Sequence, residues 1–198
     1  FGEHLALLET ALGRAARRVS QRVCATLVEF VDTGSVALSE PLLRFLERHL
    51  DGDGEAERVP ALFHALLSRL LAERRLGDAH RLLYDEIPPR TGTVQARACM
   101  QAVVATNRLR LALLQANDQA AERTRVASER TSDAGQCDFA VGDLAVQKAR
   151  LTFQEEPSRE TVAFLKRAIM IYQDLDDQAG LARANLDFGL VRLAQEDL

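Results

Sequence analysis

Eight polar residues recur at a helical spacing along the second half of the chain, and their side chains suit recognition of a peptide. The central four, at positions 143, 147, 150 and 154, follow one another at intervals that place them on one face of a helix. Arginines offer forked donors to carboxylates, and side-chain amides pair with peptide groups. We call this set the polar stripe: Asn107, Arg110, Asp143, Gln147, Arg150, Gln154, Arg183 and Asp187.

Two interpretations of the polar stripe remain open from the sequence. The outer members stand about forty residues on either side of the central four and in the same helical phase. A repeated phase favours one shared binding surface. Any amphipathic helix, however, has a polar face that meets water. The stripe therefore indicates either a peptide-binding surface or an ordinary solvated face.

Other candidate sites are weaker. No histidine lies in an HExxH motif or at a zinc-type spacing from a cysteine, so we expect no metal and no cofactor, with His64 as a helix-packing residue. Segment 51–55 resembles part of a calcium loop. Aligning Gly54 with the obligatory glycine, however, puts Pro60 where the bidentate glutamate belongs, which favours a solvated linker. Phosphate-binding glycine loops and Gly-x-Ser-x-Gly elbows are absent from the sequence, so we expect no enzyme.

Regularly spaced helix starts would position the polar stripe. Five short polar residues that suit a helix N-cap stand 39 or 40 residues apart, and each follows an apolar run rich in Ala and Leu. Such a period predicts a stack of helix-turn-helix units. The five residues are Ser39, Asp78, Asp118, Ser158 and Asp197.

Hydrophobic periodicity predicts about nine to ten helices and an all-α protein. Residues 76–78 are expected to form a turn, and residues 131–135 a polar loop. The helix over 119–129 is weakly apolar, so its packing should be thin. The predicted helices cover residues 3–19, 21–32, 39–50, 60–75, 79–87, 96–116, 119–129, 139–153, 160–175 and 180–194.

The second helices of these units repeat a pattern of small, larger and small residues, as in Thr161, Leu165 and Ala168. Ala149 and Gly189 stand at the matching small positions of two first helices. Over about residues 58–198 the chain resembles the tetratricopeptide repeat family, in a variant of about 40 residues per unit. The resemblance implies an αα-hairpin solenoid with a right-handed superhelix, in which first helices line a concave groove. The polar stripe would then lie in that groove.

Composition narrows the possible partners. Hydrophobic residues make up 47% of the chain and the net charge is −4, so neither disorder nor general affinity for nucleic acid is expected. Charged residues interrupt every apolar run, which argues against a membrane span. Cys24, Cys99 and Cys137 are interpreted as buried thiols in a reducing, cytoplasmic setting.

These observations predict a protein- or peptide-binding scaffold that forms part of a larger protein. Residues 1–57 are expected to form a helical cap or divergent repeats, and residues 58–198 one continuous solenoid truncated at its C-terminal end. The alternative is a sensor or regulatory segment of a multidomain bacterial transcription regulator. The final helix is too apolar for a terminal cap. We therefore expect self-association through Leu186, Phe188, Leu190 and Leu193.

Overall fold

The structure is a computed structural model, and it describes residues 26–27, 42–43, 59–85, 93–135, 137–155 and 158–196. Every regular element in these ranges is helical, and none is a strand. The prediction of an all-α protein is therefore confirmed for these residues. They form seven α-helices and one π-helical segment. Other helices expected between residues 1 and 57 lie outside the described ranges, as does the predicted domain boundary at 57–58.

The chain divides into two units, Phe1–Asn107 and Arg108–Leu198. In the first unit, helix α4 (Val59–Ala72) is followed by α5 (Leu76–His80), and the π-helical segment η1 (Arg81–Asp85) continues from α5. Helix α6 (Val94–Leu114) begins in this unit. Because α4 has leucines at helical spacing, one side of it is buried, with Leu66, Leu67 and Leu70 fully covered.

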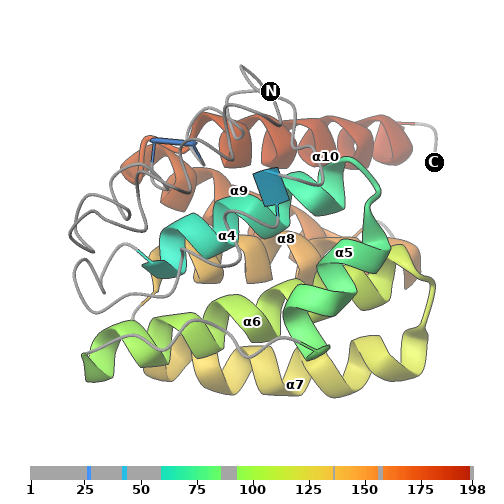
Figure 1. Ribbon diagram of the computed structural model, residues 1–198. Coiled ribbons are helices and arrows are strands. Elements are labelled where there is room, and N and C mark those ends of the chain that lie inside the picture. The colour runs from blue at the N-terminus through green and yellow to red at the C-terminus, as the bar shows by residue number, and fades with distance from the viewer. Residues whose placement is uncertain are drawn as a thin grey trace, which may run out of the picture. The chain divides into compact units, whose positions relative to one another are not determined.

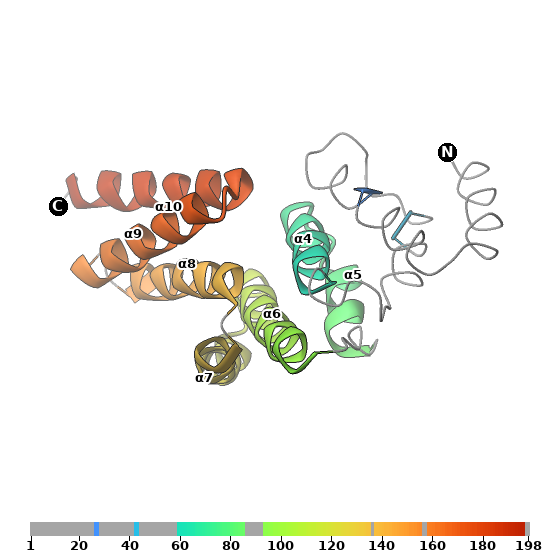
Figure 2. The same ribbon diagram turned by 90° about the vertical axis from the view of Figure 1, so that its left-hand side faces the viewer.

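The second unit holds the end of α6 and four further helices. These are α7 (Asp118–Gly135), α8 (Asp138–Glu155), α9 (Arg159–Asp174) and α10 (Gln178–Glu196). Helix α8 lies between α7 and α9, and α10 runs beside α9 (Figure 1, Figure 2). Helix α9 packs closely on both α8 and α10, whereas the contacts of α8 with α7 and with α10 are less extensive.

Three of the connections between helices share one backbone geometry. The residues Arg74, Ala116 and Asp176 have φ values of 58°, 52° and 53°, in the left-handed region. In each turn the following N–H donates to a carbonyl five residues earlier, as from Asn117 to Ala112 at 3.0 Å. This arrangement is the Schellman motif, which usually places glycine at the left-handed position. The chain therefore closes three helices with the same turn and without that glycine.

Helix starts confirm one predicted cap and correct two others. The Ser158 hydroxyl accepts from the Thr161 N–H at 3.2 Å, so Ser158 caps α9 as expected. Asp118 is instead the first residue of α7, because the Asn117 side chain accepts from the Ala120 N–H at 3.0 Å. Asp78 lies inside α5, and its carboxylate bonds the guanidinium groups of Arg75 and Arg81 rather than a backbone N–H. Ser39 and Asp197 lie outside the described residues.

Three local expectations were wrong. Residues 76–78 belong to α5, since the turn forms earlier, around Arg74. Residues 131–135 belong to α7, in which the Thr131 hydroxyl donates to the Ala127 carbonyl of its own helix at 3.0 Å. Cys99 and Cys137 are each disulfide-bonded rather than free thiols.

Tyr172 is the centre of the packing between α8, α9 and α10. It is 1% exposed and lies in a cluster with Val146, Ala168 and Ala184. Glycine at position 180 leaves room for the Tyr172 ring, because a Cβ built at Gly180 would lie 2.5 Å from the ring carbon Cδ1. This small residue lets α10 approach α9 closely.

Candidate functional site

The structure buries half of the polar stripe, namely Asn107, Arg110, Asp143 and Gln147. Asp143 is 3% exposed and accepts a hydrogen bond of 2.5 Å from the Tyr172 hydroxyl. Arg183 of α10 also approaches the Asp143 carboxylate, at 3.5 Å. Burial and the Asp143 charge both raise the pKa of Tyr172, so the hydroxyl stays protonated and donates. Asp143 thus links α8 to α9 and α10 from the interior.

Arg110, at the end of α6, belongs to the same buried cluster. Only 6% of it is exposed, and burial lowers its pKa to about 10, against the opposing influence of the Asp143 carboxylate. Arg110 therefore carries its charge at neutral pH. The nearby guanidinium groups of Arg183 and Arg150 lower its pKa further. Positive charge is gathered here around one central carboxylate.

The remaining stripe residues differ in their surroundings. Arg150 donates to Asp187 at 2.8 Å, which joins α8 to α10. Gln147 is 2% exposed, and its Oε1 accepts no hydrogen bond from the described residues. Gln154 is exposed. In the first unit, Asn107 is fully buried, with its Nδ2 atom 2.9 Å from the Val103 carbonyl oxygen and 3.4 Å from Nδ1 of His64.

This placement bears on the two interpretations of the polar stripe, as a peptide-binding surface or as a solvated face. Asn107, Arg110, Asp143 and Gln147 have almost no surface to offer a partner. Asp143 contacts Tyr172 of a neighbouring helix, and Asn107 donates to the Val103 carbonyl of its own helix. Of the central four residues, Asp143 and Gln147 are therefore buried, Arg150 is half-buried and Gln154 is exposed. Asp143 is a buried polar contact between helices.

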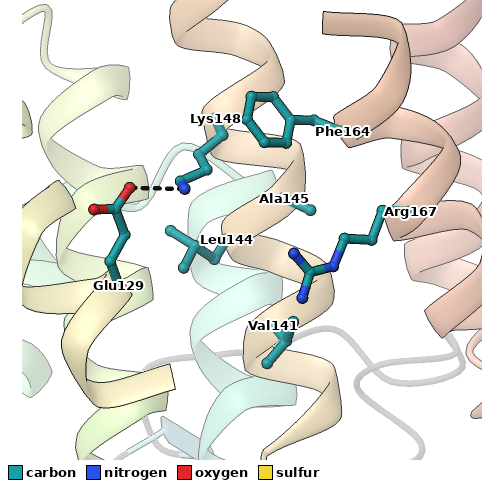
Figure 3. A pocket seen from close by; sticks show the side chains of 7 residues that line it. All are labelled: Glu129, Val141, Leu144, Ala145, Lys148, Phe164 and Arg167. Atoms are coloured by element: carbon teal, nitrogen blue, oxygen red, sulfur yellow. Dashed lines mark ion pairs between the residues drawn. The ribbon is translucent and has the colours of Figure 1, made fainter. Parts of the chain in front are cut away.

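A groove lies on the opposite side of α8. With about 100° per residue, Val141, Ala145 and Lys148 lie roughly half a turn from Asp143 and Gln147. The first part of the groove has a cavity volume of about 240 Å³ and is shown in Figure 3. Its lining combines apolar side chains with three charged ones: Glu129, Val141, Leu144, Ala145, Lys148, Phe164 and Arg167.

A second cavity of about 310 Å³ continues the groove, sharing Glu129, Lys148 and Phe164 with the first. Leu151 and Thr152 of α8 extend its floor. We call the two cavities together the α7–α9 groove. Its walls come from α7 and α9, and its floor comes from α8.

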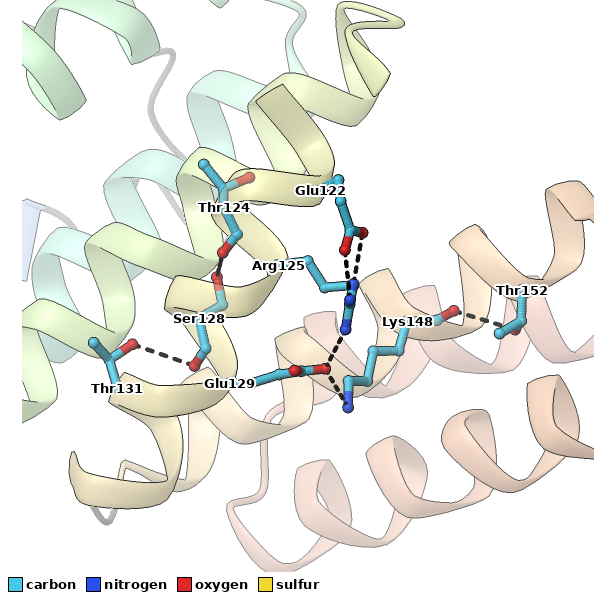
Figure 4. A network of polar contacts seen from close by, with 8 residues as sticks. All are labelled: Glu122, Thr124, Arg125, Ser128, Glu129, Thr131, Lys148 and Thr152. Carbon is cyan, nitrogen blue, oxygen red and sulfur yellow. Dashed lines mark hydrogen bonds and ion pairs between the residues drawn. The ribbon is translucent and has the colours of Figure 1, made fainter. Parts of the chain in front are cut away.

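An ion-pair network occupies the wall from α7 (Figure 4). Lys148 bonds Glu129 at 2.7 Å and also stands 5.3 Å from the centre of the Phe164 ring. Arg125 bonds Glu129 at 2.9 Å and Glu122 at 2.6 Å. The hydrogen bond from Lys148, together with the Lys148 and Arg125 charges, lowers the pKa of Glu129 against the opposing effect of burial.

Arg167 stands at the other wall of the groove. It is exposed on α9, and no ion pair joins it to a carboxylate among the described residues. Figure 3 shows its side chain directed toward α8, above Val141 and beside Ala145. The Glu129 and Lys148 charges offset each other. This part of the groove therefore presents one net positive charge beside an apolar floor.

The α7 wall of the groove is made of the charged side chains Glu122, Arg125 and Glu129, whereas the buried side of α7 carries small side chains. Its inward positions hold Ala121, Thr124 and Ser128. The hydroxyls of Thr124 and Ser128 donate to carbonyls of their own helix, at 2.7 Å in both cases. None of these three side chains lines either cavity, and Ala121 packs with Leu109 and Ala112 of α6 and with Leu144 of α8. The weakly apolar pattern of 119–129 was the sequence signal for this site.

The predicted association residues also separate into two groups. Leu186, Leu190 and Leu193 are 66%, 50% and 60% exposed on α10. Phe188 instead packs inward against the cluster of Ala149, Leu165 and Val191. Its ring is on the buried side of α10 because it lies about 200° around the helix from Leu186. Phe188 is therefore a core residue of the second unit.

Two further findings bound the chemistry. Over the ranges that the structure describes, His, Cys, Asp and Glu side chains form no group of three or more that could hold a metal ion. The same ranges contain no helix whose length and apolar character would let it cross a membrane. Comparison of this chain with protein-family models, with curated proteins and with solved structures found no match.

Proposed function

We propose that this chain is a peptide-binding helical module, of the tetratricopeptide-like kind that the sequence resembles, and that it binds through the α7–α9 groove. The observation that carries the proposal is an apolar floor beside a guanidinium that has no carboxylate partner among the described residues. Grooves lined by helices bind an apolar side chain of a peptide, and a charged side chain beside the groove pairs with an opposite charge of that peptide. The proposal assigns no reaction to the chain.

The ligand follows from the lining. Leu144, Ala145 and Phe164 would receive one apolar side chain of the peptide. Arg167 would bind a carboxylate next to that anchor through a charge-assisted hydrogen bond. Lys148 is already bonded to Glu129, so it contributes mainly its contact with the Phe164 ring. We therefore propose a segment with an apolar residue beside an acidic one.

Selection from a displayed library of random linear peptides tests this proposal. We expect the intact chain to enrich peptides in which an apolar residue neighbours Asp or Glu. Arg167→Glu should weaken binding of an enriched peptide by at least about tenfold, since a hydrogen bond to a charged group contributes about 1.5–3 kcal/mol. Lys166→Glu is the matched control. It makes the same charge change at the neighbouring exposed position of α9, outside the groove lining.

A second measurement locates the bound peptide. Lys148 and Lys166 are the only lysines of the chain. Reductive methylation with isotope-labelled methyl groups keeps their charge and gives each its own NMR signal. Peptide binding should shift the Lys148 signal and leave the Lys166 signal in place. Equal shifts of both signals, or equal binding by Arg167→Glu and Lys166→Glu, would contradict the groove assignment.

A further inference from the structure

The outward side of α10 is a continuous apolar strip. With about 100° per residue, six apolar residues fall within an arc of about 100° that runs along roughly four turns of the helix. All six are exposed, and no polar side chain interrupts the arc. We call this set the α10 strip: Ala179, Ala182, Leu186, Gly189, Leu190 and Leu193.

The opposite side of the same helix is apolar as well. Leu181, Ala184, Phe188 and Val191 pack against α8 and α9. A surface helix normally has one apolar side and one polar side. Helix α10 has two apolar sides, which is the pattern of a helix covered on both. An exposed apolar strip of this length marks a contact surface.

We propose that the α10 strip joins two copies of this chain through an antiparallel, two-fold pairing of their α10 helices. The strip has small residues and leucines in an order that is complementary to itself. Around a two-fold axis between residues 187 and 188, Leu186 faces Gly189 of the partner subunit. Around the same axis, Leu193 faces Ala182 of the partner subunit. Each of these leucines meets a position with little or no side chain, so the two helices can approach closely.

Two ion pairs hold the strip in place for this contact. Asp187 bonds Arg150 at 2.8 Å, and Arg183 approaches Asp143 at 3.5 Å, so two successive turns of α10 are tied to α8 on one side of the helix. At Gly189, a Cβ would meet no atom within 4 Å, which leaves open space for a side chain of a second copy. A rigid, preformed surface lowers the cost of association.

The expected affinity is modest. One helix pair buries less than the roughly 1,200 Å² of total surface that typical stable complexes reach. We therefore expect a dimer that forms at micromolar concentrations and dissociates on dilution. This contact uses α10 alone and does not depend on the peptide groove between α7 and α9.

Sedimentation velocity over a dilution series tests the dimer. The unaltered chain should change from monomer to dimer with rising concentration. Leu186→Glu places a charge at the centre of the strip and should weaken association by at least tenfold. Met170→Glu is the matched control, because Met170 is 64% exposed on α9, close to the 66% of Leu186, and lies outside the strip. This control should dimerise as the unaltered chain does.

Cross-linking tests the orientation. With Cys24 replaced by Ser, a mixture of Ala182→Cys and Leu193→Cys chains should form a disulfide-linked dimer under mild oxidation. Each variant alone should not, because an antiparallel pair keeps identical positions apart. Helical circular dichroism would confirm that each variant is folded. A monomer at every concentration, dimerisation of Leu186→Glu, or cross-linking of Ala182→Cys with itself would overturn the proposal.

Discussion

Helices α7 and α9 pack on the same helix, α8, yet with different results. Helix α9 buries Leu165, Ala168 and Tyr172 against its neighbours. Helix α7 buries the small side chains of Ala121 and Ser128 and presents the charged Glu122, Arg125 and Glu129 to the groove beside it. Both helices are preceded by ordinary N-caps. Side-chain volume, rather than helix formation, therefore separates a packed contact from a possible binding site.

The largest expected effect comes from removing the large buried side chain of Tyr172 in α9. Tyr172→Ala should destabilise the second unit by about 3–5 kcal/mol, the range for deleting a buried aromatic side chain. It also leaves the buried Asp143 carboxylate without the hydroxyl that donates to it. Thr124→Ala in α7 should change stability by less than about 1 kcal/mol, because Thr124 bonds only its own helix.

Denaturant unfolding followed by helical circular dichroism would measure both substitutions. Thr124→Ala is the appropriate comparison because it removes a side chain from the helix on the other side of α8. Equal losses of stability would show that α7 packs as tightly as α9. That result would remove the physical basis for the groove.

A smaller effect is expected at the closest approach of α10 to α9. Gly180→Ala would put a Cβ 2.6 Å from both Cε1 of Tyr172 and the Asp177 carboxylate. Overpacking of this kind costs about 1–3 kcal/mol. Gly189→Ala on the same helix meets open space, so the better helix propensity of Ala should stabilise by up to about 1 kcal/mol.

Thermal melting at a dilution where the chain is monomeric compares these two glycines. The dilution matters because Gly189 belongs to the α10 strip. Opposite shifts in melting temperature are expected for the two variants. A stabilising Gly180→Ala would mean that α9 and α10 are less closely packed than the structure indicates.

Alkaline pH provides a third comparison. The pKa of Tyr172 is raised by burial and by the Asp143 charge. A group whose pKa is higher in the folded state contributes stability below its unfolded pKa, about 10 for tyrosine, and loses it as pH rises further. The packing around α9 should therefore weaken above about pH 10. Tyr172→Phe should lose this part of the pH dependence.

Tyrosinate absorbance in a Tyr84→Phe background measures the ionisation of Tyr172 directly, because Tyr84 and Tyr172 are the only tyrosines. We expect ionisation to occur together with loss of the helical signal. Ionisation of Tyr172 in the fully helical protein would show that the residue is solvent-accessible and that the contact with α8 is loose.

The sequence was a good guide to helices and a poor guide to the partners of polar residues. Periodicity located α8 and α9 to within a residue or two, because their apolar positions repeat regularly. It could not tell that Asp143 is buried. A carboxylate on a helix is normally expected in water, and its burial here depends on Tyr172 and Arg183, which lie 29 and 40 residues away. Only tertiary contacts decide such a placement.

For the groove, the sequence predicted weak packing but did not identify the lining residues. Weak apolar character in 119–129 predicted thin packing, and α7 does pack over a smaller area than α9. The lining residues Lys148 and Arg167 carried no signal of their own, since isolated basic residues on helices usually meet water. Ala116 was also unremarkable in sequence, although its backbone is left-handed. Turn geometry without glycine is not readable from residue type.

The smallest expected effect concerns the turn at Ala116. It separates the contribution of side-chain packing from that of the turn that connects two helices. The turns that lead into α7 and α10 have the same hydrogen bonds, with Asn117 and Asp177 donating to carbonyls five residues earlier at 3.0 and 2.9 Å. Ala116 has a left-handed φ of 52°, which costs about 1–2 kcal/mol for a residue with a Cβ. Glycine removes that strain but adds about 0.4–1 kcal/mol of entropy to the unfolded chain.

Ala116→Gly should therefore stabilise the second unit by about 0.5–1 kcal/mol. Asp176→Gly should gain less, because Asp tolerates the left-handed region better and its carboxylate accepts a hydrogen bond of 2.8 Å from Gln178. Calorimetric melting temperatures would rank the two variants, and hydrogen exchange would show whether α7 gains protection. If Ala116→Gly protected the α7 amides as fully as those of α9, the weak attachment of α7 would come from its strained turn. We expect α7 to stay less protected, because the turn is shared with α10 and the missing side-chain volume is not.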